Sequence, residues 1–313
     1  MKILVTGSTG FVARQFILLA ESKGDVCFKH ARNVSVDKSV FSADLSLQVD
    51  WSSVLKGVDC VVHCAALVHQ SKNGNSLDYS QVNTLGTLAL AEQAALAGVG
   101  RFVFLSSIKV NGECTALDIP FREAAIGPPN DPYGKSKYVA EVELQKLASK
   151  TGMEVVIIRP PLVYGPGVRA NFQSMMKWVQ KGIPLPLKNT DNKRSLIYLE
   201  NLTDFIRLCT HHPSAANQTF LVSDQHDVST SELLTSLSSS MGKRSRLFPF
   251  PKSLLKFACR LTGKVAITDR IFGNLQLDTS KAQELLDWIP PYTVREGIQK
   301  TVEDFLMKGS KKL

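Results

Sequence analysis

Short apolar runs alternate with segments of helical periodicity along the first half of the chain. The apolar runs lie at residues 2–6, 25–29, 59–66, 101–105 and 154–158. Residues 11–24 and 77–97 instead carry apolar side chains three and four positions apart, the spacing of one helix face. A run that is apolar throughout is typical of a strand buried on both faces of a parallel sheet. The pattern therefore predicts an α/β fold, a doubly wound parallel sheet with helices on both sides.

The second half of the chain is less regular. Beyond Gly165 the elements shorten, and prolines and glycines cluster at residues 182–186 and 248–251. We expect a first domain at residues 1–165 and a smaller α/β C-terminal lobe, mainly residues 166–313, with some segments returning to the first domain. Ligands bind outside the carboxyl ends of such parallel strands. The substrate cleft is therefore expected between the sheet and the smaller lobe.

A glycine-rich turn joins the first apolar run to the first helix. Gly7 permits a tight turn, Gly10 lets the backbone approach a pyrophosphate, and Ala13 is small enough for close packing of helix and strand. The start of the helix then presents free N–H groups to the phosphates. This arrangement predicts a Rossmann-type, dinucleotide-binding first domain. The expected cofactor contacts in the turn are Gly7, Thr9, Gly10, Phe11 and Val12.

The end of the second apolar run bears on which dinucleotide binds. A site for NAD usually has a carboxylate there, but this chain has Arg32 and no acid from His30 to Asn33. Arg32 is suited to pair with a 2′-phosphate, so we expect NADP, with NAD possible. The alternative is that Arg32 stacks on the adenine or lies in solvent. Further contacts are expected from Asp44 and Leu45 near the adenine, and from Ala65 and Ala66 after the third run.

Tyr133 and Lys137 are candidate catalytic residues. Their helix is expected to begin at Asp131, with Pro132 in its first position, and to end at Gly152. Residues four apart lie on one helix face, and a nearby ammonium group favours a phenolate. The pair is therefore suited to move a proton at a sugar or alcohol hydroxyl. Taken alone, the same spacing also fits a solvated helix face.

Composition excludes several other classes of protein. The chain has 313 residues and a net charge of +9. No segment reaches the ~18 apolar residues of a membrane span, and no signal peptide precedes the first run, so we expect a cytoplasmic protein with no membrane partner. The positive charge suits phosphorylated ligands, since no nucleic-acid-binding motif is found. The six cysteines are expected to be free thiols, and no spacing predicts a metal site.

Several motifs together resemble the extended short-chain dehydrogenase/reductase superfamily, in its NAD-dependent epimerase/dehydratase, UDP-glucose 4-epimerase-like branch. They are the glycine turn at residues 6–13, Ser106-Ser107, Tyr133-x-x-x-Lys137 and the run from Arg159 to Pro166, with further matches at 192–197 and 277–281. The run from Phe102 to Gly112 looks like UDP-2-acetamido-2,6-dideoxy-hexos-4-ulose 4-reductases of bacterial polysaccharide clusters.

The resemblance implies a role for each matching residue. Tyr133 is the expected acid/base, Ser107 the partner of the same substrate oxygen, and Lys137 the ligand of the nicotinamide ribose that also tunes Tyr133. Pro160 is an expected cofactor contact. The expected substrate contacts are His69, Ser107, Lys109, Asn171, Arg194 and Arg270, of which Asn171, Arg194 and Arg270 are assigned to the diphosphate.

The resemblance also limits the reaction. Sugar 4,6-dehydratases place an Asp-Glu pair where this chain has Ile108 and Lys109, so we reject dehydration. The favoured function is NADPH-dependent 4-keto reduction of a UDP-linked 2-acetamido-2,6-dideoxy-hexos-4-ulose in bacterial surface-polysaccharide synthesis. The alternative is a UDP-glucose or UDP-N-acetylglucosamine 4-epimerase, which keeps NAD bound. From another class, we weigh a non-catalytic NADP-sensing module, disfavoured because Ser107, Tyr133 and Lys137 are all present.

The same resemblance predicts a homodimer. In similar enzymes two long helices pair with their copies across a two-fold axis. The corresponding helices here are expected at residues 77–97 and 131–150.

Overall fold

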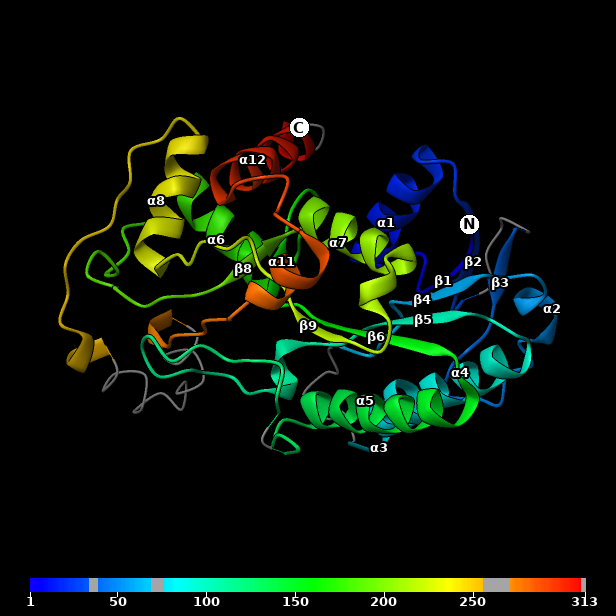
Figure 1. Cartoon of the computed structure of the whole chain (residues 1–313). Helices are drawn as coiled ribbons and strands as arrows, with labels where there is room; N and C mark the ends of the chain where they lie inside the picture. The colour runs from blue at the N-terminus through cyan, green and yellow to red at the C-terminus, as the bar shows by residue number, and fades with distance from the viewer. Residues whose placement is uncertain (34–38, 69–75, 126, 256–270, 311–313) are drawn as a thin grey trace.

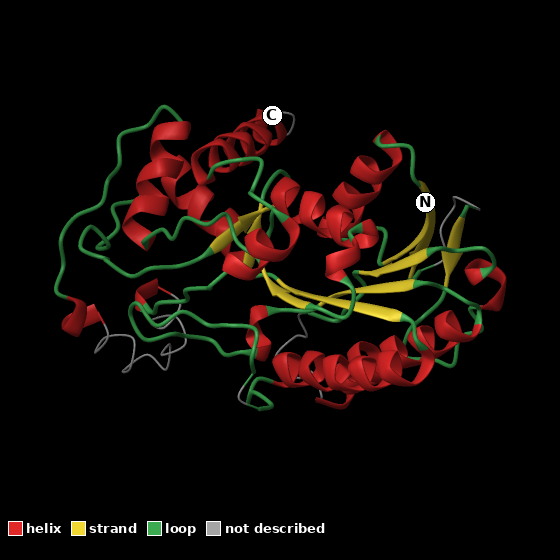
Figure 2. Ribbon diagram, in the orientation of Figure 1, coloured by secondary structure: helices red, strands yellow, loops and turns green. Residues whose placement is uncertain are grey.

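A parallel sheet with helices on both faces forms the larger part of the molecule in the computed structural model (Figure 1, Figure 2). The structure describes residues 1–33, 39–68, 76–125, 127–255 and 271–310. The seven strands of the sheet are β1 (Lys2–Thr6), β2 (Val26–Ala31), β3 (Val40–Ser42), β4 (Cys60–His63), β5 (Arg101–Leu105), β6 (Glu154–Arg159) and β9 (Thr219–Leu221). A separate two-stranded sheet contains β7 (Leu162–Tyr164) and β8 (Leu196–Tyr198).

The helices vary from single turns to five turns. They are α1 (Phe11–Ser22), α2 (Ser52–Leu55), α3 (Ser76–Tyr79), α4 (Gly86–Leu96), α5 (Pro132–Thr151), α6 (Ala170–Gln180), α7 (Leu199–His211), α8 (Thr230–Ser240), α11 (Ser280–Leu286) and α12 (Val294–Ser310). A π-helical segment at Ser80–Leu85 and 3₁₀ turns at Ile108–Val110 and Pro213–Ala215 complete the described elements.

The strand order of the large sheet is β3-β2-β1-β4-β5-β6-β9, and all its pairs are parallel. The chain winds outward from β1 to one edge and then from β4 to the other. This order is that of a doubly wound dinucleotide-binding fold, and the carboxyl end of β1 lies at its switch point. The predicted α/β fold with a Rossmann-type sheet and a smaller lobe is confirmed.

Two apolar layers hold the helices on the sheet. On one face Ile3 and Val5 pack with buried side chains of α1, α7 and α11. On the other face Leu4 and Phe104 pack with buried side chains of α4 and α5. Figure 1 shows α1 and α7 above the sheet and α4 and α5 below it. Neighbouring side chains along a strand point to opposite faces, so each central strand must be apolar throughout to bury both layers.

Helix α5 begins and ends as its sequence predicts. The Asp131 side chain accepts a hydrogen bond from the backbone N–H of Gly134 at 2.8 Å, and Pro132 occupies the first helical position. Gly152 ends the helix in the left-handed conformation with φ 74°. These caps place Tyr133 in the first turn of α5, beside the carboxyl ends of the strands.

The helix expected at residues 77–97 runs from Ser76 to Leu96 and contains a π-helical segment. The chain forms α3, then the π-helical segment, then α4. Within the π-helical segment, the Asn83 side chain exchanges hydrogen bonds with the backbone of Leu67 at 2.7 and 3.0 Å and donates to Ser136 Oγ at 3.1 Å. The expected helix is therefore present, and the tertiary hydrogen bonds of Asn83 accompany its wider π-helical turn. Such turns are frequent at functional sites.

The smaller lobe lies beyond the carboxyl ends of the strands. Its core contains Tyr164, Phe172 and Tyr198 together with apolar side chains of α6, α8 and α12. The Tyr164 hydroxyl donates to Asp224 Oδ2 at 2.8 Å, and the Asn201 amide donates to Asp224 Oδ1 at 2.8 Å. Helix α8 starts with the capping box of Ser229 and Glu232. No helix in the described part of the chain is long and apolar enough to cross a membrane.

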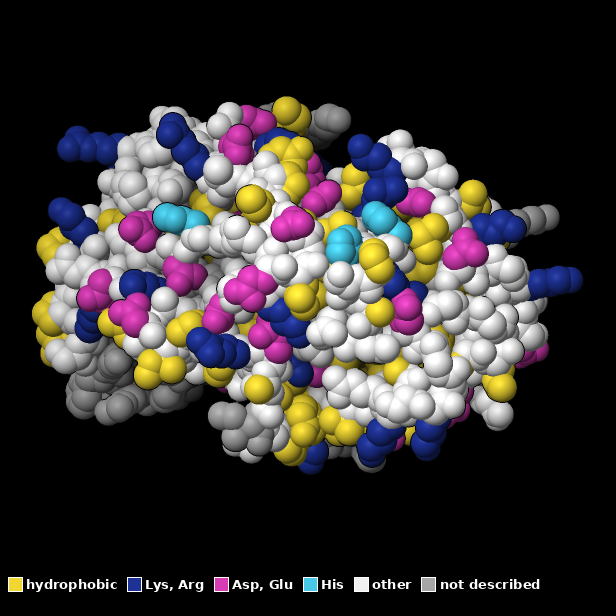
Figure 3. Space-filling model, viewed as in Figure 1, with side chains coloured by type: hydrophobic (Ala, Val, Ile, Leu, Met, Phe, Trp, Pro, Cys, Tyr) yellow, Lys and Arg dark blue, Asp and Glu magenta, His cyan; other side chains and the backbone are white. Residues whose placement is uncertain are grey.

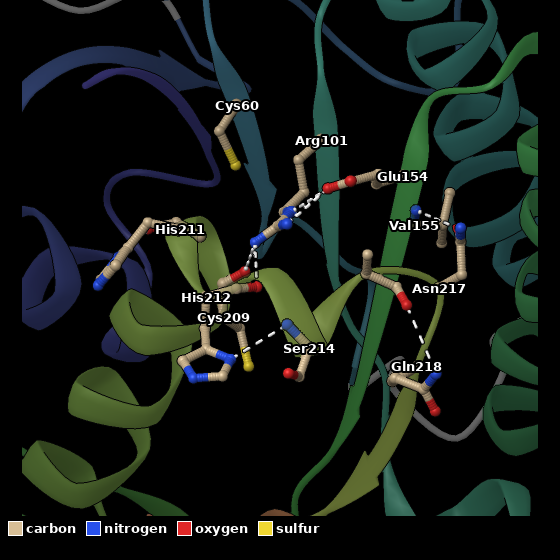
Figure 4. A network of polar contacts seen from close by, with 12 residues as sticks. Cys60, Arg101, Glu154, Val155, Cys209, His211, His212, Ser214, Asn217 and Gln218 are labelled. Carbon is tan, nitrogen blue, oxygen red and sulfur yellow. Dashed lines mark hydrogen bonds and ion pairs between the residues drawn. The ribbon is translucent and has the colours of Figure 1, made fainter. Parts of the chain in front are cut away.

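The amino ends of β5 and β6 are joined to α7 through Arg101 (Figure 4). Its Nη1 donates to the carbonyl oxygens of Cys209 at 2.9 Å and His212 at 3.0 Å, at the end of α7. Its Nη2 forms an ion pair with Glu154 at 2.5 Å. A cation at a helix C-terminus bonds otherwise unpaired carbonyls. This network stabilises the amino ends of β5 and β6, at the opposite end of these strands from the candidate site.

Candidate active site

Ser107 and Tyr133 are brought together at the carboxyl end of β5. Ser107 is the second residue after the strand and caps the 3₁₀ turn, accepting a hydrogen bond from Lys109 N at 3.3 Å. Its side chain lies near enough to that of Tyr133 to act on the pKa of the phenol. The Tyr133 ring is half-buried and lies edge-on to the Tyr79 ring, with centroids 6.1 Å apart. The two hydroxyl groups therefore share one position at which a substrate oxygen can be held.

The protonation state of Tyr133 differs from the expectation. Burial raises the pKa of Tyr133 to about 12, the nearby charge of Asp131 adds to the rise, and the Ser107 side chain only partly opposes it. The expected lowering of this pKa by Lys137 is not seen, because the Lys137 ammonium group is directed to other partners. Tyr133 is therefore a neutral phenol in this structure, ready to donate a proton.

Lys137 lies one turn after Tyr133 and is buried. Its Nζ donates to the carbonyl oxygen of Leu105 at 2.9 Å and lies 4.4 Å from the centre of the Phe104 ring. Burial lowers the pKa of Lys137 to about 8, and the Glu141 carboxylate partly opposes the fall. Lys137 thus carries its charge at neutral pH but loses it on mild alkalinisation. A cation held at the end of β5 suits a ribose hydroxyl pair.

A buried ion pair supports this helix face. Glu141 lies one turn after Lys137, and Arg159 ends β6; their side chains are 3% and 5% exposed. Arg159 donates to the two Glu141 oxygens with Nε at 3.0 and 3.2 Å and with Nη2 at 2.5 Å. Ser106 Oγ donates to Glu141 as well, and Arg159 Nη1 bonds to Asn111 at 2.9 Å. Every oxygen of the buried carboxylate has a donor, which fixes α5 against β6.

The glycine turn fits a dinucleotide pyrophosphate. Gly7 has φ +68°, and a Cβ there would lie 2.9 Å from Ala65 Cα. A Cβ on Gly10 would lie 2.9 Å from the Gly7 carbonyl oxygen. The start of α1 has no side-chain cap, while Thr9 and Gly10 are exposed. Unfilled helix N–H groups beside two glycines match the chemistry of a phosphate cradle. Phe11 and Val12 instead pack into the smaller lobe and the sheet core.

The adenine end of the expected cofactor site has a mixed charge. Arg32 is exposed directly after β2. The pKa of Asp44 is lowered mainly by hydrogen bonds from Ser46 and to a smaller extent by the positive charge of Arg32. Arg32 therefore lies near the carboxylate expected at the adenine. Leu45 is buried, and its carbonyl oxygen lies so close to Gly86 that a Cβ there would be 2.4 Å away. Ala65 and Ala66, both half-buried, follow β4 as expected.

Of the expected substrate contacts, Lys109 joins the catalytic cluster only indirectly. Its Nζ forms ion pairs with Asp131 at 3.1 Å and Glu113 at 3.2 Å. Arg194 lies in the smaller lobe, bridged to Val228 and Leu275, and donates to the Gly273 carbonyl at 3.1 Å. Of the remaining substrate candidates, Asn171 is exposed at the start of α6, and His69 and Arg270 lie outside the described residues. The carbonyl oxygen of Pro160, an expected cofactor contact, accepts from Ile108 N at 3.0 Å.

Sequence reasoning missed several residues that surround Tyr133. The Asn83 side chain hydrogen-bonds to the backbone of Leu67 and to Ser136 Oγ. Ser136 Oγ in turn donates to the Tyr133 carbonyl at 2.8 Å. The position of Glu141, four residues after Lys137 on the same helix face, was a signal available in the sequence. Asn83 had no such signal, since its role depends on a contact between distant segments. Within the described ranges, no cluster of His, Cys, Asp or Glu is arranged to hold a metal ion.

Comparison with known proteins agrees with this arrangement. A protein-family model described as the NAD dependent epimerase/dehydratase family matches residues 3–223. A UDP-glucose 4-epimerase from Vibrio cholerae is 46% identical over 99% of this chain and 97% of its own length. This relative supports the 4-epimerase alternative better than the 4-ketoreductase that the sequence analysis favoured.

Two solved structures share the fold. A UDP-glucose 4-epimerase from Thermotoga maritima, with UDP-glucose, has a TM-score of 0.75 at 21% identity, over 98% of this chain and 99% of its own. A UDP-glucuronic acid 4-epimerase from Bacillus cereus, in complex with NAD, has a TM-score of 0.78 at 19% identity, over 98% and 99%. Because the family model matches more than half of this chain, the chain belongs to the NAD dependent epimerase/dehydratase family of extended short-chain dehydrogenases/reductases.

Proposed function

We propose that the protein is a UDP-hexose 4-epimerase, acting on UDP-glucose or its 2-acetamido counterpart. The observation that carries the proposal is that Ser107 lies near Tyr133, whose helix carries buried Lys137 one turn later. One proton-transferring pair suffices for reversible oxidation at one sugar carbon. The near-full-length likeness to the Vibrio cholerae protein supports the same reaction.

The chain's own residues account for orientation and proton transfer. Ser107 would hold the sugar 4-oxygen, and Tyr133 would take its proton as the carbinol is oxidised and return a proton as the ketone is reduced. Lys137 would hold the nicotinamide ribose, and the turn at Gly7 and Gly10 the pyrophosphate. When bound, the nicotinamide supplies the hydride acceptor and, in its oxidised form, a positive charge that favours the phenolate.

The carboxylate nearest to Tyr133 in the sequence is committed elsewhere. Asp131 accepts from the Gly134 N–H and pairs with Lys109. It therefore does not provide the second acid/base that removal of water from a hexose needs. This supports a reaction without dehydration, in agreement with Ile108 and Lys109 after Ser107.

A specific observation keeps the 4-ketoreductase as a second candidate. Arg32 follows β2 where NAD-binding sites carry an acid, and its charge suits a 2′-phosphate. The neutral Tyr133 also fits a one-way proton donation to a ketone. In this case the substrate would be a UDP-linked 2-acetamido-2,6-dideoxy-hexos-4-ulose and the cofactor NADPH.

The cofactor decides between the two functions. Purified protein would be denatured, its released nucleotide identified, and refilled protein titrated with NADPH and NADH by fluorescence. Tightly held NAD near one per chain, followed by interconversion of UDP-hexoses, is the expected result. An empty protein that prefers NADPH and oxidises it with the 4-keto sugar would replace the epimerase with the reductase. Binding of neither nucleotide would remove both in favour of a non-enzymatic module.

A homodimer and a cytoplasmic location remain part of the proposal. Leu85 and Leu96 are exposed apolar residues on the α3–α4 segment, the one expected to pair with its copy alongside α5. Contact with a second copy of the chain would cover both leucines, which supports an interface on this side of the molecule. A monomeric mass by light scattering at micromolar concentration would contradict the dimer.

A further inference from the structure

The end of the smaller lobe combines exposed aromatic and aliphatic side chains with a concentration of positive charge. The apolar residues are Trp178, Ile183, Phe248, Phe250 and Leu254, each at least 38% exposed. We call these five side chains, with the basic residues around them, the lobe edge. Figure 3 shows hydrophobic and Lys or Arg side chains at the left end of the molecule, together with some Asp or Glu side chains, where Figure 1 places α8.

Two chain segments build this surface, and hydrogen bonds hold them side by side. Leu185 N donates to the Arg246 carbonyl at 3.1 Å, and Phe248 N donates to the Leu185 carbonyl at 3.0 Å. Arg246 Nη1 also bonds to the Gly182 carbonyl at 3.2 Å. Ile183 N bonds back to the Trp178 carbonyl at 3.1 Å, at the end of α6. The aromatic residues of both segments thus belong to one fixed surface.

The outward direction of these side chains follows from the chain pattern. Leu247 packs against the lobe core, whereas Arg246, Phe248 and Phe250 are exposed. Alternate residues of an extended segment point to the same side, so these three share the solvent side. Trp178 lies on α6, and Lys181, three positions later, is the C-cap residue of this helix, so the two lie on the same side of its last turn. Two phenyl rings and an indole that are partly exposed on one surface mark it as a candidate interaction site.

The charge of the lobe edge identifies what covers it. Residues 177–188 and 243–252 contain no Asp or Glu. They contain seven basic residues: Lys177, Lys181, Lys188, Lys243, Arg244, Arg246 and Lys252. One of these, Lys252, pairs with Asp191, whereas Lys243 and Arg246 donate to backbone carbonyls, which carry no full negative charge to balance theirs. The two segments alone therefore carry seven positive charges and no negative one.

We propose that the lobe edge is a docking surface for an anionic lipid bilayer. Aromatic side chains between lysines and arginines are the composition of protein surfaces that bind headgroups electrostatically and insert rings at the interface. Such docking is peripheral and needs no spanning helix. It therefore revises the expectation of no membrane partner, which rested on the lack of a spanning segment.

The test is flotation of the full-length protein with vesicles of phosphatidylcholine alone or mixed with phosphatidylglycerol. We expect binding to the mixed vesicles, and its loss as salt rises from about 0.05 M to about 0.5 M, since screening shortens the reach of surface charge. Equal binding to both vesicle types, or binding to neither, would overturn the proposal.

Paired variants locate the contact. Reversing two charges with Lys181→Glu and Arg244→Glu should weaken partition at least about tenfold. The control, Lys23→Glu with Lys56→Glu, makes the same change in net charge at exposed positions of the larger domain and should cost less than about twofold. Equal losses from both pairs would overturn a localised surface.

The apolar contribution is tested in the same way. Phe248→Ser with Phe250→Ser should weaken partition at least about tenfold, against little change for Leu18→Ser with Leu47→Ser, which are exposed elsewhere. Unchanged urea midpoints and cofactor binding would establish that the variants are folded. If the phenylalanine variant instead changes only the oligomeric mass, the lobe edge is a contact between copies of this chain and the proposal fails.

Discussion

Replacing Glu141 by Gln removes the negative charge from the buried pair with Arg159. Both side chains are almost fully buried, and Arg159 donates to Glu141 through Nε and Nη2. The isosteric amide keeps the volume but leaves the guanidinium without a counter-charge. Breaking a buried ion pair from one side costs about 3–5 kcal/mol, because the remaining charge stays desolvated. We expect a loss of this size in the free energy of unfolding.

The assay is urea unfolding followed by tryptophan fluorescence and extrapolated to water. The matched control is Glu143→Gln on the same helix. Its side chain is 39% exposed and pairs with Lys146 at 2.7 Å. A surface pair of this kind is worth less than about 1 kcal/mol, so the control should change stability little. A loss below about 1 kcal/mol for Glu141→Gln would refute the reasoning from burial.

A second readout separates the effect on Lys137 from general destabilisation. The Glu141 carboxylate opposes the fall in the pKa of Lys137 to about 8. Without it this pKa falls further, so the ammonium group is lost at lower pH. If turnover needs charged Lys137, its alkaline limb should move to lower pH in Glu141→Gln and stay in place in Glu143→Gln. An unmoved limb in folded protein would mean that the charge of Lys137 does not depend on Glu141.

Three further predictions follow from single residues. Tyr133→Phe should lower turnover by about 10²–10⁴-fold while leaving cofactor binding nearly intact; more than about a tenth of the wild-type rate would contradict its acid/base role. Gly7→Ala should destabilise the protein by more than about 1 kcal/mol and weaken nucleotide binding by titration, because its φ is +68° and its Cβ would lie 2.9 Å from Ala65 Cα. Burial holds the pKa of His63 well below its usual 6.5, so below about pH 6.5 the unfolded chain takes up a proton that the folded one does not. Stability should therefore fall from pH 7.5 to pH 5.5, by up to about 1.4 kcal/mol per unit for this histidine, and urea unfolding of His63→Gln should show a shallower slope.

The sequence determined the architecture of this protein because its signals are local. An uninterrupted apolar run at Lys2–Thr6 demands a strand buried on both faces, and Gly7 and Gly10 permit only a tight turn before α1. Asp131 and Gly152 cap α5 wherever the rest of the chain lies. Spacing along that helix also places Tyr133 and Lys137 on one face.

Tertiary structure decided the electrostatics of the site and the irregular elements. The sequence suggested a tyrosine with a lowered pKa, but burial raises the pKa of Tyr133. The Lys137 ammonium group contacts the Leu105 carbonyl and the Phe104 ring. The π-helical segment depends on hydrogen bonds from Asn83 to segments far away in the chain. Desolvation and long-range hydrogen bonds depend on which segments meet in space, and a one-dimensional pattern of residue types does not contain that information.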